Sequence, residues 1–142
     1  MGAHISVPLW QRTIKSRYRL QGSKCRICGN VAFPPHTFCP TCQQSDCLQP
    51  LALSGKGRVE SYTFIRAGGT PPEFTWQSRV QEGYIVALIK LEEGPSLVAQ
   101  LVNCQPEEVS IGMPVHACLR KLYEEEGVIR YCYKFIPDER KG

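Results

Sequence analysis

The chain has no long apolar run and no leader-like beginning. No stretch approaches the ~18 consecutive apolar residues that a membrane-spanning helix requires. The first thirty residues also lack the order of a basic region followed by an apolar region, which is typical of a secretory signal. We therefore expect a cytoplasmic protein with no membrane partner.

Acidic side chains are missing from residues 1–45. This part carries six basic side chains, whereas residues 46–142 carry eleven basic and thirteen acidic ones. A surface that favours negatively charged partners is therefore expected near the front. The slightly acidic balance of the rest argues against a surface that follows nucleic-acid phosphates. The basic residues are Arg12, Lys15, Arg17, Arg19, Lys24 and Arg26.

The sequence offers little catalytic machinery. It lacks a paired acid and base, an open metal site and a glycine loop that could cradle phosphates. His116 and Cys118 fall on the same side of a predicted strand, and Cys132 falls on the neighbouring strand. No third group that could orient the histidine is evident, and a buried free cysteine commonly behaves as a small apolar residue. The prediction is that the chain is not an enzyme.

Cysteine, in contrast, is abundant, with eight residues in the chain. Four of them form two Cys-x-x-Cys pairs, Cys25 with Cys28 and Cys39 with Cys42, separated by ten residues. A two-residue gap lets both thiolates of a pair bind one metal ion, and two such turns complete a tetrahedral site. Four thiolates leave no open position, so the spacing predicts a structural zinc ion.

Two alternatives to zinc are iron in a rubredoxin-like site and a pair of redox-active dithiols. A redox pair usually begins a helix in an α/β fold, and that context is missing here. Gly29 suits the left-handed backbone of the first turn, whereas Gln43 suits the second turn less well. His36 lies between the pairs and is expected to be a surface loop residue.

The apolar pattern predicts a mainly β protein with one N-terminal helix. Trp10, Ile14 and Tyr18 recur every four residues between about 8 and 20, with Pro8 suited to the first turn and Gly22 to the stop. The segment that follows has few large apolar groups, and a unit this small rarely buries enough surface to fold without a metal or a disulfide. We expect a helical segment at 1–22, a zinc ribbon at 23–50 and a β domain at 51–142.

Five runs in the last part have strand character. Short turns join the second run to the third and the fourth to the fifth, and a longer link joins the third to the fourth. This order predicts a five-stranded OB-fold barrel, with a five-stranded sandwich as the alternative. The runs are Arg58–Arg66, Tyr84–Leu91, Leu97–Val102, Val115–Tyr123 and Val128–Phe135.

A long loop at 67–83 separates the first two runs and contains Phe74 and Trp76. Long loops commonly carry function, and aromatic side chains suit recognition. We expect Phe74 and Trp76 to contact a partner or ligand; the alternative is that they fold back as a small satellite core.

Several motifs together resemble one family. Tyr18-Arg19-Leu20-x-Gly22-x-Lys24-Cys25-x-x-Cys28-Gly29 leads into Phe33-Pro34-Pro35 and Cys39-Pro40-x-Cys42. Leu53-Ser54-Gly55-Lys56-Gly57, Leu91-Glu92-Glu93-Gly94-Pro95 and Ile111-Gly112-Met113-Pro114-Val115 follow. In this order and spacing, they are similar to the acyl-CoA-associated zinc-ribbon plus OB-fold proteins, over residues 8 to 137.

The resemblance implies an N-terminal helix, a rubredoxin-like ribbon and an OB barrel. It also implies a zinc ion on Cys25, Cys28, Cys39 and Cys42. Family members are small companions of thiolase-superfamily enzymes: in archaea they bridge acetoacetyl-CoA thiolase and hydroxymethylglutaryl-CoA synthase, and in bacteria they accompany thiolase-like aldolases. That company implies binding of CoA or acyl-CoA.

Two functions remain open on the sequence. The first is a non-catalytic subunit that binds a thiolase-class enzyme and holds an acyl-CoA. The phosphates of the CoA, or an acidic surface of the partner, would contact the basic residues at 12, 17, 19, 24 and 26. Arginine suits this role because it donates two parallel hydrogen bonds to a phosphate. The second is a single-stranded nucleic-acid-binding module, with Tyr62, Phe64, Tyr131 and Tyr133 as stacking platforms.

Overall fold

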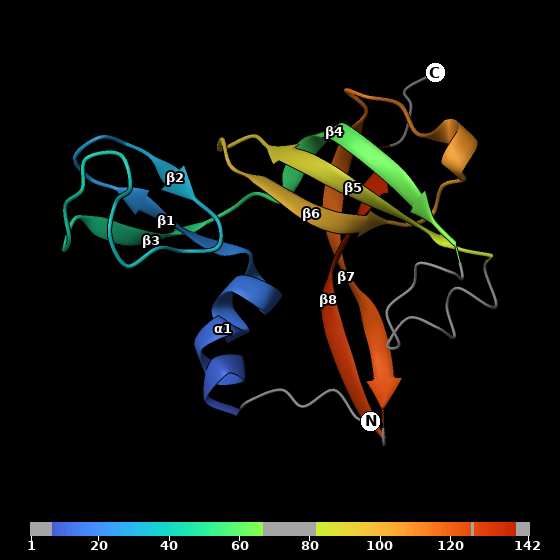
Figure 1. Cartoon of the computed structure of the whole chain (residues 1–142), viewed down its shortest axis with the longest axis horizontal. Helices are drawn as coiled ribbons and strands as arrows, with labels where there is room; N and C mark the ends of the chain where they lie inside the picture. Colours follow the sequence, from blue (N-terminus) through green and yellow to red (C-terminus); the bar gives the residue numbers. More distant parts are fainter. Residues whose placement is uncertain (1–6, 67–81, 126, 139–142) are drawn as a thin grey trace.

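The computed structural model describes residues 7–66, 82–125 and 127–138 (Figure 1). Helix α1 (Val7–Arg19) leads into a three-stranded antiparallel sheet of β1 (Gln21–Cys25), β2 (Val31–Ala32) and β3 (Leu48–Ala52). The barrel strands follow as β4 (Lys56–Ile65), β5 (Tyr84–Leu91), β6 (Ser96–Leu101), β7 (Pro114–Glu125) and β8 (Val128–Pro137). The predicted mainly β fold is confirmed, and each barrel strand lies on one of the five predicted runs.

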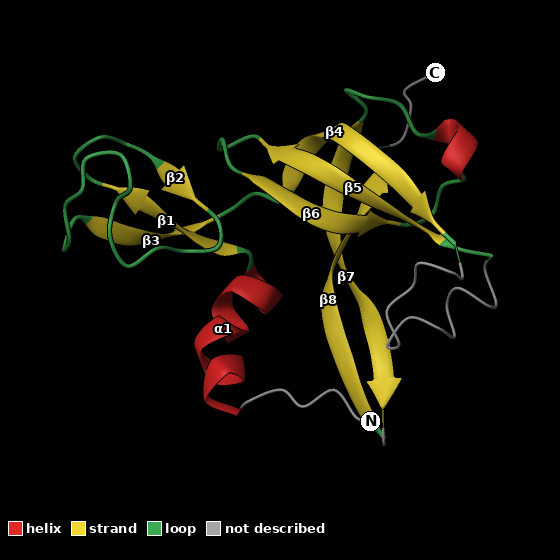
Figure 2. Cartoon of the chain, in the orientation of Figure 1, coloured by secondary structure: helices red, strands yellow, loops and turns green. Residues whose placement is uncertain are grey.

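The five strands close into a barrel in the order β4-β5-β6-β8-β7, with β7 pairing back onto β4 (Figure 2). The contact between β6 and β8 is parallel, at Leu101 and Phe135, and the other neighbouring strands are antiparallel. A closed sheet with this order is an OB-fold barrel. The sandwich alternative is therefore wrong.

One apolar core serves both the barrel and the base of the ribbon sheet. Its most buried side chains include Val59, Ile89 and Phe135 inside the barrel. Leu20 and Leu53, from the two chain segments that join the ribbon to its neighbours, are buried in the same core. The ribbon and the barrel are thus joined by packing as well as by the chain. Val31, Phe33 and Leu51 of the ribbon also pack against this core.

The linker between ribbon and barrel is held by hydrogen bonds on two sides. The Ser54 N–H donates to Glu93 Oε1 at 2.6 Å in the β5–β6 turn, and the Ala117 N–H of β7 donates to the Gly55 carbonyl at 2.8 Å. Burial raises the pKa of Glu93, but the hydrogen bonds from the Ser54 N–H, the Ser54 side chain and the N–H of Glu93 itself together outweigh it, and the pKa lies below its usual value. An ionised Glu93 therefore fixes the linker to the barrel.

Helix α1 ends at Arg19, and the residue that turns the chain out of the helix is Leu20 rather than Gly22. Leu20 has a positive φ of 45° and its side chain is buried in the shared core. Gly22 lies within β1, where a Cβ atom would be 2.5 Å from the Ala32 carbonyl oxygen. The prediction that Gly22 stops the helix is therefore wrong, and this glycine instead lets β1 and β2 approach closely.

The apolar stripe of α1 is only partly covered. Tyr18 is half-buried and its carbonyl accepts a 2.7 Å hydrogen bond from the Tyr133 hydroxyl of β8, whereas Ile14 is 38% exposed. This bond ties the helix to the barrel. Across the described residues, no helix combines the length and apolar character needed to cross a bilayer.

Strands β7 and β8 project past the barrel as a two-stranded arm (Figure 1). Strand β7 pairs with β4 only over Pro114–His116, while its pairing with β8 continues to Glu125. The register places Leu119, Ile129 and Tyr131 on one face of the arm, where they are 47%, 43% and 44% exposed. An isolated two-stranded ribbon with an exposed apolar face is marginally stable in water.

Replacing Tyr133 with phenylalanine tests the tie between α1 and β8. The Tyr133→Phe change leaves the Tyr18 carbonyl without this donor, so the free energy of unfolding should fall by about 1 kcal/mol. Amide hydrogen exchange in α1 should accelerate as well. Tyr131→Phe, on the same face and exposed, is the matched control. Equal effects of the two changes would contradict the assignment.

Candidate metal centre and interaction surfaces

The two Cys-x-x-Cys turns have the same backbone shape. The Gly29 N–H donates to the Cys25 carbonyl at 3.0 Å, and the Gln43 N–H donates to the Cys39 carbonyl at 2.9 Å. Gly29 has a φ of +74° and Gln43 a φ of +57°. The left-handed conformation expected at Gly29 is confirmed, and Gln43 adopts it too, although its side chain makes this conformation less favourable.

The turns bring four sulfur atoms together. The Sγ atoms of Cys25, Cys28, Cys39 and Cys42 all lie within 4.8 Å of one another. Cys25 and Cys42 are 3.6 Å apart, and Cys28 and Cys39 are 3.4 Å apart. Zinc–sulfur bonds of about 2.3 Å place the corners of a tetrahedron about 3.8 Å apart. The donor set and its spacing therefore fit a four-thiolate zinc ion.

Backbone N–H groups favour the thiolate form of the two buried sulfurs. The N–H of Cys28, followed by that of Ile27, lowers the pKa of Cys25 to about 6 despite burial. The N–H groups of Cys42 and Thr41 likewise lower the pKa of Cys39. These donors prepare the centre for negative sulfur atoms, which is the form that binds a metal ion.

The other two sulfurs keep their protons in the absence of a cation. The N–H of Asn30 lowers the pKa of Cys28, but shared hydrogen bonds with Cys39 and Cys25 and burial raise it to about 11. The pKa of Cys42 is also raised to about 11, because burial and the neighbouring thiols outweigh the N–H of Gln44. Four sulfurs this close cannot all be negative unless a cation lies between them.

The five predicted basic contact residues are all exposed, on α1 and the adjoining ribbon. Arg17 Nε donates to Thr13 Oγ1 at 3.1 Å, and Arg26 Nη2 donates to the Asp46 carbonyl at 2.7 Å. Their role toward a ligand or partner stays a prediction. The same holds for Phe74 and Trp76, which lie outside the described residues. The basic residues are Arg12, Arg17 and Arg19 on the helix, Lys24 in β1 and Arg26 in the first turn.

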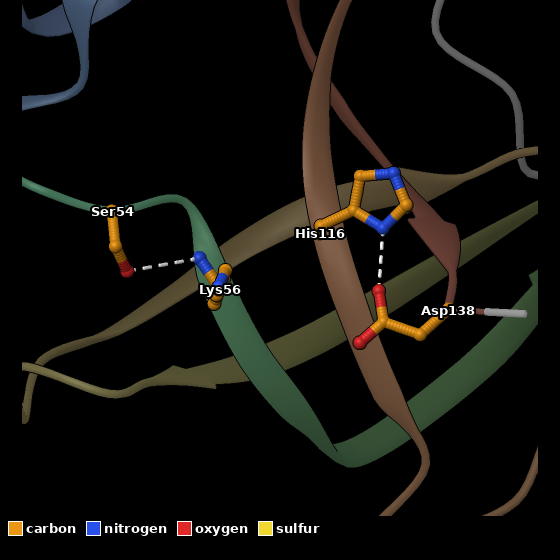
Figure 3. Close-up of polar contacts among 4 residues, drawn as sticks. All are labelled: Ser54, Lys56, His116 and Asp138. Carbon is orange, nitrogen blue, oxygen red and sulfur yellow. Dashed lines mark hydrogen bonds and ion pairs between the residues drawn. The ribbon is translucent and has the colours of Figure 1, made fainter.

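The sequence analysis missed a partner of His116. His116 Nδ1 lies 2.5 Å from Asp138 Oδ1, because the pairing of Val115 with Pro137 brings the end of β8 beside β7 (Figure 3). Asp138 is the orienting group that the sequence did not reveal. The two side chains are 42% and 45% exposed, however, and the structure gives no hydrogen bond between His116 and Cys118 in the described part of the chain.

Among the described residues, the surroundings of this pair do not supply a nucleophile. Lys56 pairs with His116 across the strands, and its N–H donates to Ser54 Oγ at 3.2 Å, away from the imidazole (Figure 3). The cross-strand partner of Cys118 is Lys134. An exposed carboxylate–histidine pair without an adjacent nucleophile gives no support to catalysis here.

The strand aromatics proposed for base stacking divide into two groups. Phe64 and Tyr133 are partly buried against the shared core, whereas Tyr62 and Tyr131 are exposed on different strands. A surface hollow of about 1030 Å³ lies elsewhere on the barrel, beside the link before β7, and carries two carboxylates, Glu108 and Asp138. Neither feature forms a basic, aromatic track for a nucleic acid.

The His36 side chain is not part of the metal centre. His36 is exposed, and its backbone N–H donates to Ser23 Oγ at 3.2 Å. The four-sulfur group does not include it, in agreement with the expectation of a surface loop residue.

Comparisons with known proteins agree with this architecture. Residues 12–46 match the family described as "ChsH2, rubredoxin-like zinc ribbon domain", and residues 51–120 match "ChsH2, C-terminal OB-fold domain". A "DUF35 domain-containing scaffold protein" of Methanocaldococcus jannaschii is 42% identical over 130 residues, covering 90% of this chain and 88% of the relative. A "probable enoyl-CoA hydratase alpha subunit" of Thermomonospora curvata is 36% identical over 107 residues, which are 75% of this chain and 30% of that protein.

A solved structure extends the likeness to three dimensions. A chain of the "Ltp2-ChsH2(DUF35) aldolase" is 28% identical, with a TM-score of 0.68, and the match covers 96% of this chain and 98% of the other. The similarity thus includes the helix, the ribbon and the barrel together. This chain therefore belongs to the DUF35 family of scaffold proteins, with a ChsH2-type zinc ribbon followed by an OB-fold domain.

Proposed function

We propose that this protein is a non-catalytic scaffold subunit that binds a thiolase-superfamily enzyme of CoA-thioester metabolism in the cytoplasm. The observation that carries the proposal is the 42% identity to a scaffold protein over nearly the full length of both chains. The likeness to a chain of an aldolase complex and to a subunit of an enoyl-CoA hydratase supports it. The eight cysteines form no disulfide in the structure, as suits a reducing compartment.

In this proposal Cys25, Cys28, Cys39 and Cys42 hold a structural zinc ion. The far end of the ribbon has a very small core of its own, made of three buried cysteines with Cys42 and Leu48 against them. Such a cluster buries too little apolar surface to order the two turns, so the free energy of zinc binding supplies the difference. Four thiolates fill the coordination sphere, and zinc here fixes shape and activates no water.

The partner surface combines α1 with the apolar face of the β7–β8 arm. The two are joined by the bond from Tyr133 to Tyr18, and both carry exposed apolar side chains, such as Ile14 and Tyr131. Apolar anchors beside arginine are typical of protein interfaces. The partner is an acetoacetyl-CoA thiolase, a hydroxymethylglutaryl-CoA synthase or a thiolase-like aldolase.

The exposed cations of α1 and the ribbon are the groups in this proposal that contact an acidic partner surface or the phosphates of a bound CoA. Arginine suits both roles, because its planar guanidinium donates two parallel hydrogen bonds to a carboxylate or a phosphate. Phe74 and Trp76 would contact the same partner or ligand.

Removal of zinc should unfold the ribbon selectively. On chelation, the amide resonances between Cys25 and Leu48 should lose their dispersion in two-dimensional NMR spectra, while most barrel resonances persist. Cys39→Ser should have the same effect, and Cys104→Ser, a half-buried cysteine after β6, should not. A fully dispersed spectrum after complete metal removal would contradict a structural role for zinc.

Reversing charge on α1 should weaken partner binding. The double change Arg12→Glu and Arg19→Glu should reduce the affinity for the co-purifying thiolase-superfamily enzyme by at least tenfold, measured by surface plasmon resonance. The double change Lys56→Glu and Lys90→Glu, at two exposed lysines of β4 and β5, is the charge-matched control. Unchanged affinity in the double variant, or an equal loss in the control, would refute a specific role of the helix.

The isolated chain should not turn over acyl-CoA thioesters. Acetyl-CoA and acetoacetyl-CoA incubated with the purified, zinc-loaded protein should be recovered intact by liquid chromatography. Release of free CoA above the background of a protein-free control, lost on His116→Ala, would show that the chain is an enzyme and that the scaffold assignment is incomplete.

A further inference from the structure

A fifth sulfur lies directly against the metal centre. Cys47 Sγ is 3.5 Å from Cys25 Sγ, almost the same separation as that between Cys25 and Cys42. Cys47 is only 4% exposed, and its thiol also interacts with that of Cys42. It does not belong to the mutual group of four sulfurs. Cys25 therefore has one close sulfur contact within the group, to Cys42, and another outside it, to Cys47.

The backbone holds Cys47 against both Cys-x-x-Cys turns. Its carbonyl accepts a 2.8 Å hydrogen bond from the Arg26 N–H of the first turn. Its thiol donates to the Gln44 carbonyl at 3.2 Å, and that same carbonyl accepts the Cys39 N–H of the second turn at 3.0 Å. The next residue, Leu48, pairs with Cys25 in the sheet. The position of Cys47 is thus fixed by the same contacts that shape the centre.

We propose that Cys47 is a reserve zinc ligand that takes the place of Cys42. Cys28 is exposed and Cys42 is half-buried, so oxidants and alkylating agents reach these two more readily than they reach Cys25 or Cys39. Of the two, Cys42 is the one that Cys47 can replace, because both lie beside Cys25 Sγ, at 3.6 and 3.5 Å. When Cys42 is lost, Cys47 needs only a small movement from beside Cys25 to complete a four-sulfur tetrahedron. The ribbon then keeps its zinc and its fold.

The exchange involves no oxidation or reduction. The Cys47 S–H bond breaks, its proton passes to solvent, and the sulfur lone pair forms a bond to zinc. The bond from zinc to Cys42 breaks, and the departing thiolate takes up a proton when it is not already modified. Zinc remains divalent throughout, with four thiolates before and after.

The competing interpretation is that Cys47 only fills space in the ribbon, as buried free cysteine often does. The two roles differ in one measurable respect. A packing residue adds no sulfur to the metal, whereas a reserve ligand restores the fourth sulfur when Cys42 is absent. Cobalt(II) reports this number, because the intensity of its sulfur-to-metal charge-transfer band rises with each bound thiolate.

The test compares Cys42→Ser with Cys42→Ser/Cys47→Ser in the full chain, using cobalt(II) titration and native mass spectrometry after zinc loading. The single variant should keep one zinc ion and the charge-transfer intensity of the parent. The double variant should lose about a quarter of that intensity and bind zinc at least tenfold more weakly. Cys42→Ser/Cys104→Ser is the matched control and should behave like the single variant. Equal intensity and affinity in Cys42→Ser and Cys42→Ser/Cys47→Ser would overturn the proposal.

A second measurement applies if loss of Cys42 prevents folding. Cys47→Ser retains the sulfurs of Cys25, Cys28, Cys39 and Cys42. In the presence of an alkylating agent that reaches Cys42, this variant should lose its zinc to a chromogenic chelator several-fold faster than the parent protein does. Without that agent the two proteins should release zinc at similar rates. Identical rates under alkylation would also overturn the proposal.

Discussion

The ribbon depends on a cluster of sulfur atoms where other domains have an apolar core. The buried cluster at its far end consists of Cys25, Cys39 and Cys47. Backbone N–H groups point at the two ligand sulfurs among them and lower their pKa values, which makes the centre attractive to a cation before any ion arrives. The shape of the far end of the ribbon is therefore coupled to metal binding.

The rest of the molecule connects the ribbon rigidly to the proposed partner surface on α1 and the β7–β8 arm. Leu20 and Leu53 anchor the ribbon in the barrel core, and Glu93 fixes the linker between the ribbon and the barrel. The closed barrel then supports an arm, β7–β8, whose apolar face remains exposed beside α1. A rigid body with an unpartnered apolar and basic surface, and without an enclosed reactive site among its described residues, is suited to holding another protein in place.

The sequence predicted the features that depend on local pattern. Period-two runs located the five barrel strands because alternating residues must face the core, and the cysteine spacing located the four-sulfur group because a two-residue turn points both thiols at one site. The helix end near Leu20 was predicted, but Gly22 was wrongly chosen as the stop residue, since Leu20 itself adopts the left-handed conformation while its side chain packs in the shared core.

Features that depend on strand register could not be predicted from local sequence patterns. Asp138 meets His116, and Cys47 meets Cys25, only because of the particular pairing of β7 with β8 and of β1 with β3. A shift of one residue would separate either pair, and the apolar pattern locates the strands without giving this residue-by-residue pairing. The motif resemblance was specific enough to identify the family because it preserved order and spacing over nearly the whole chain.

X-ray absorption spectroscopy of the purified protein at the zinc edge tests the central claim most directly. The account predicts one zinc ion per chain with four sulfur neighbours at about 2.3 Å and no nitrogen or oxygen in the first shell. Folded protein without zinc, or a zinc ion with fewer than four sulfur ligands, would contradict it.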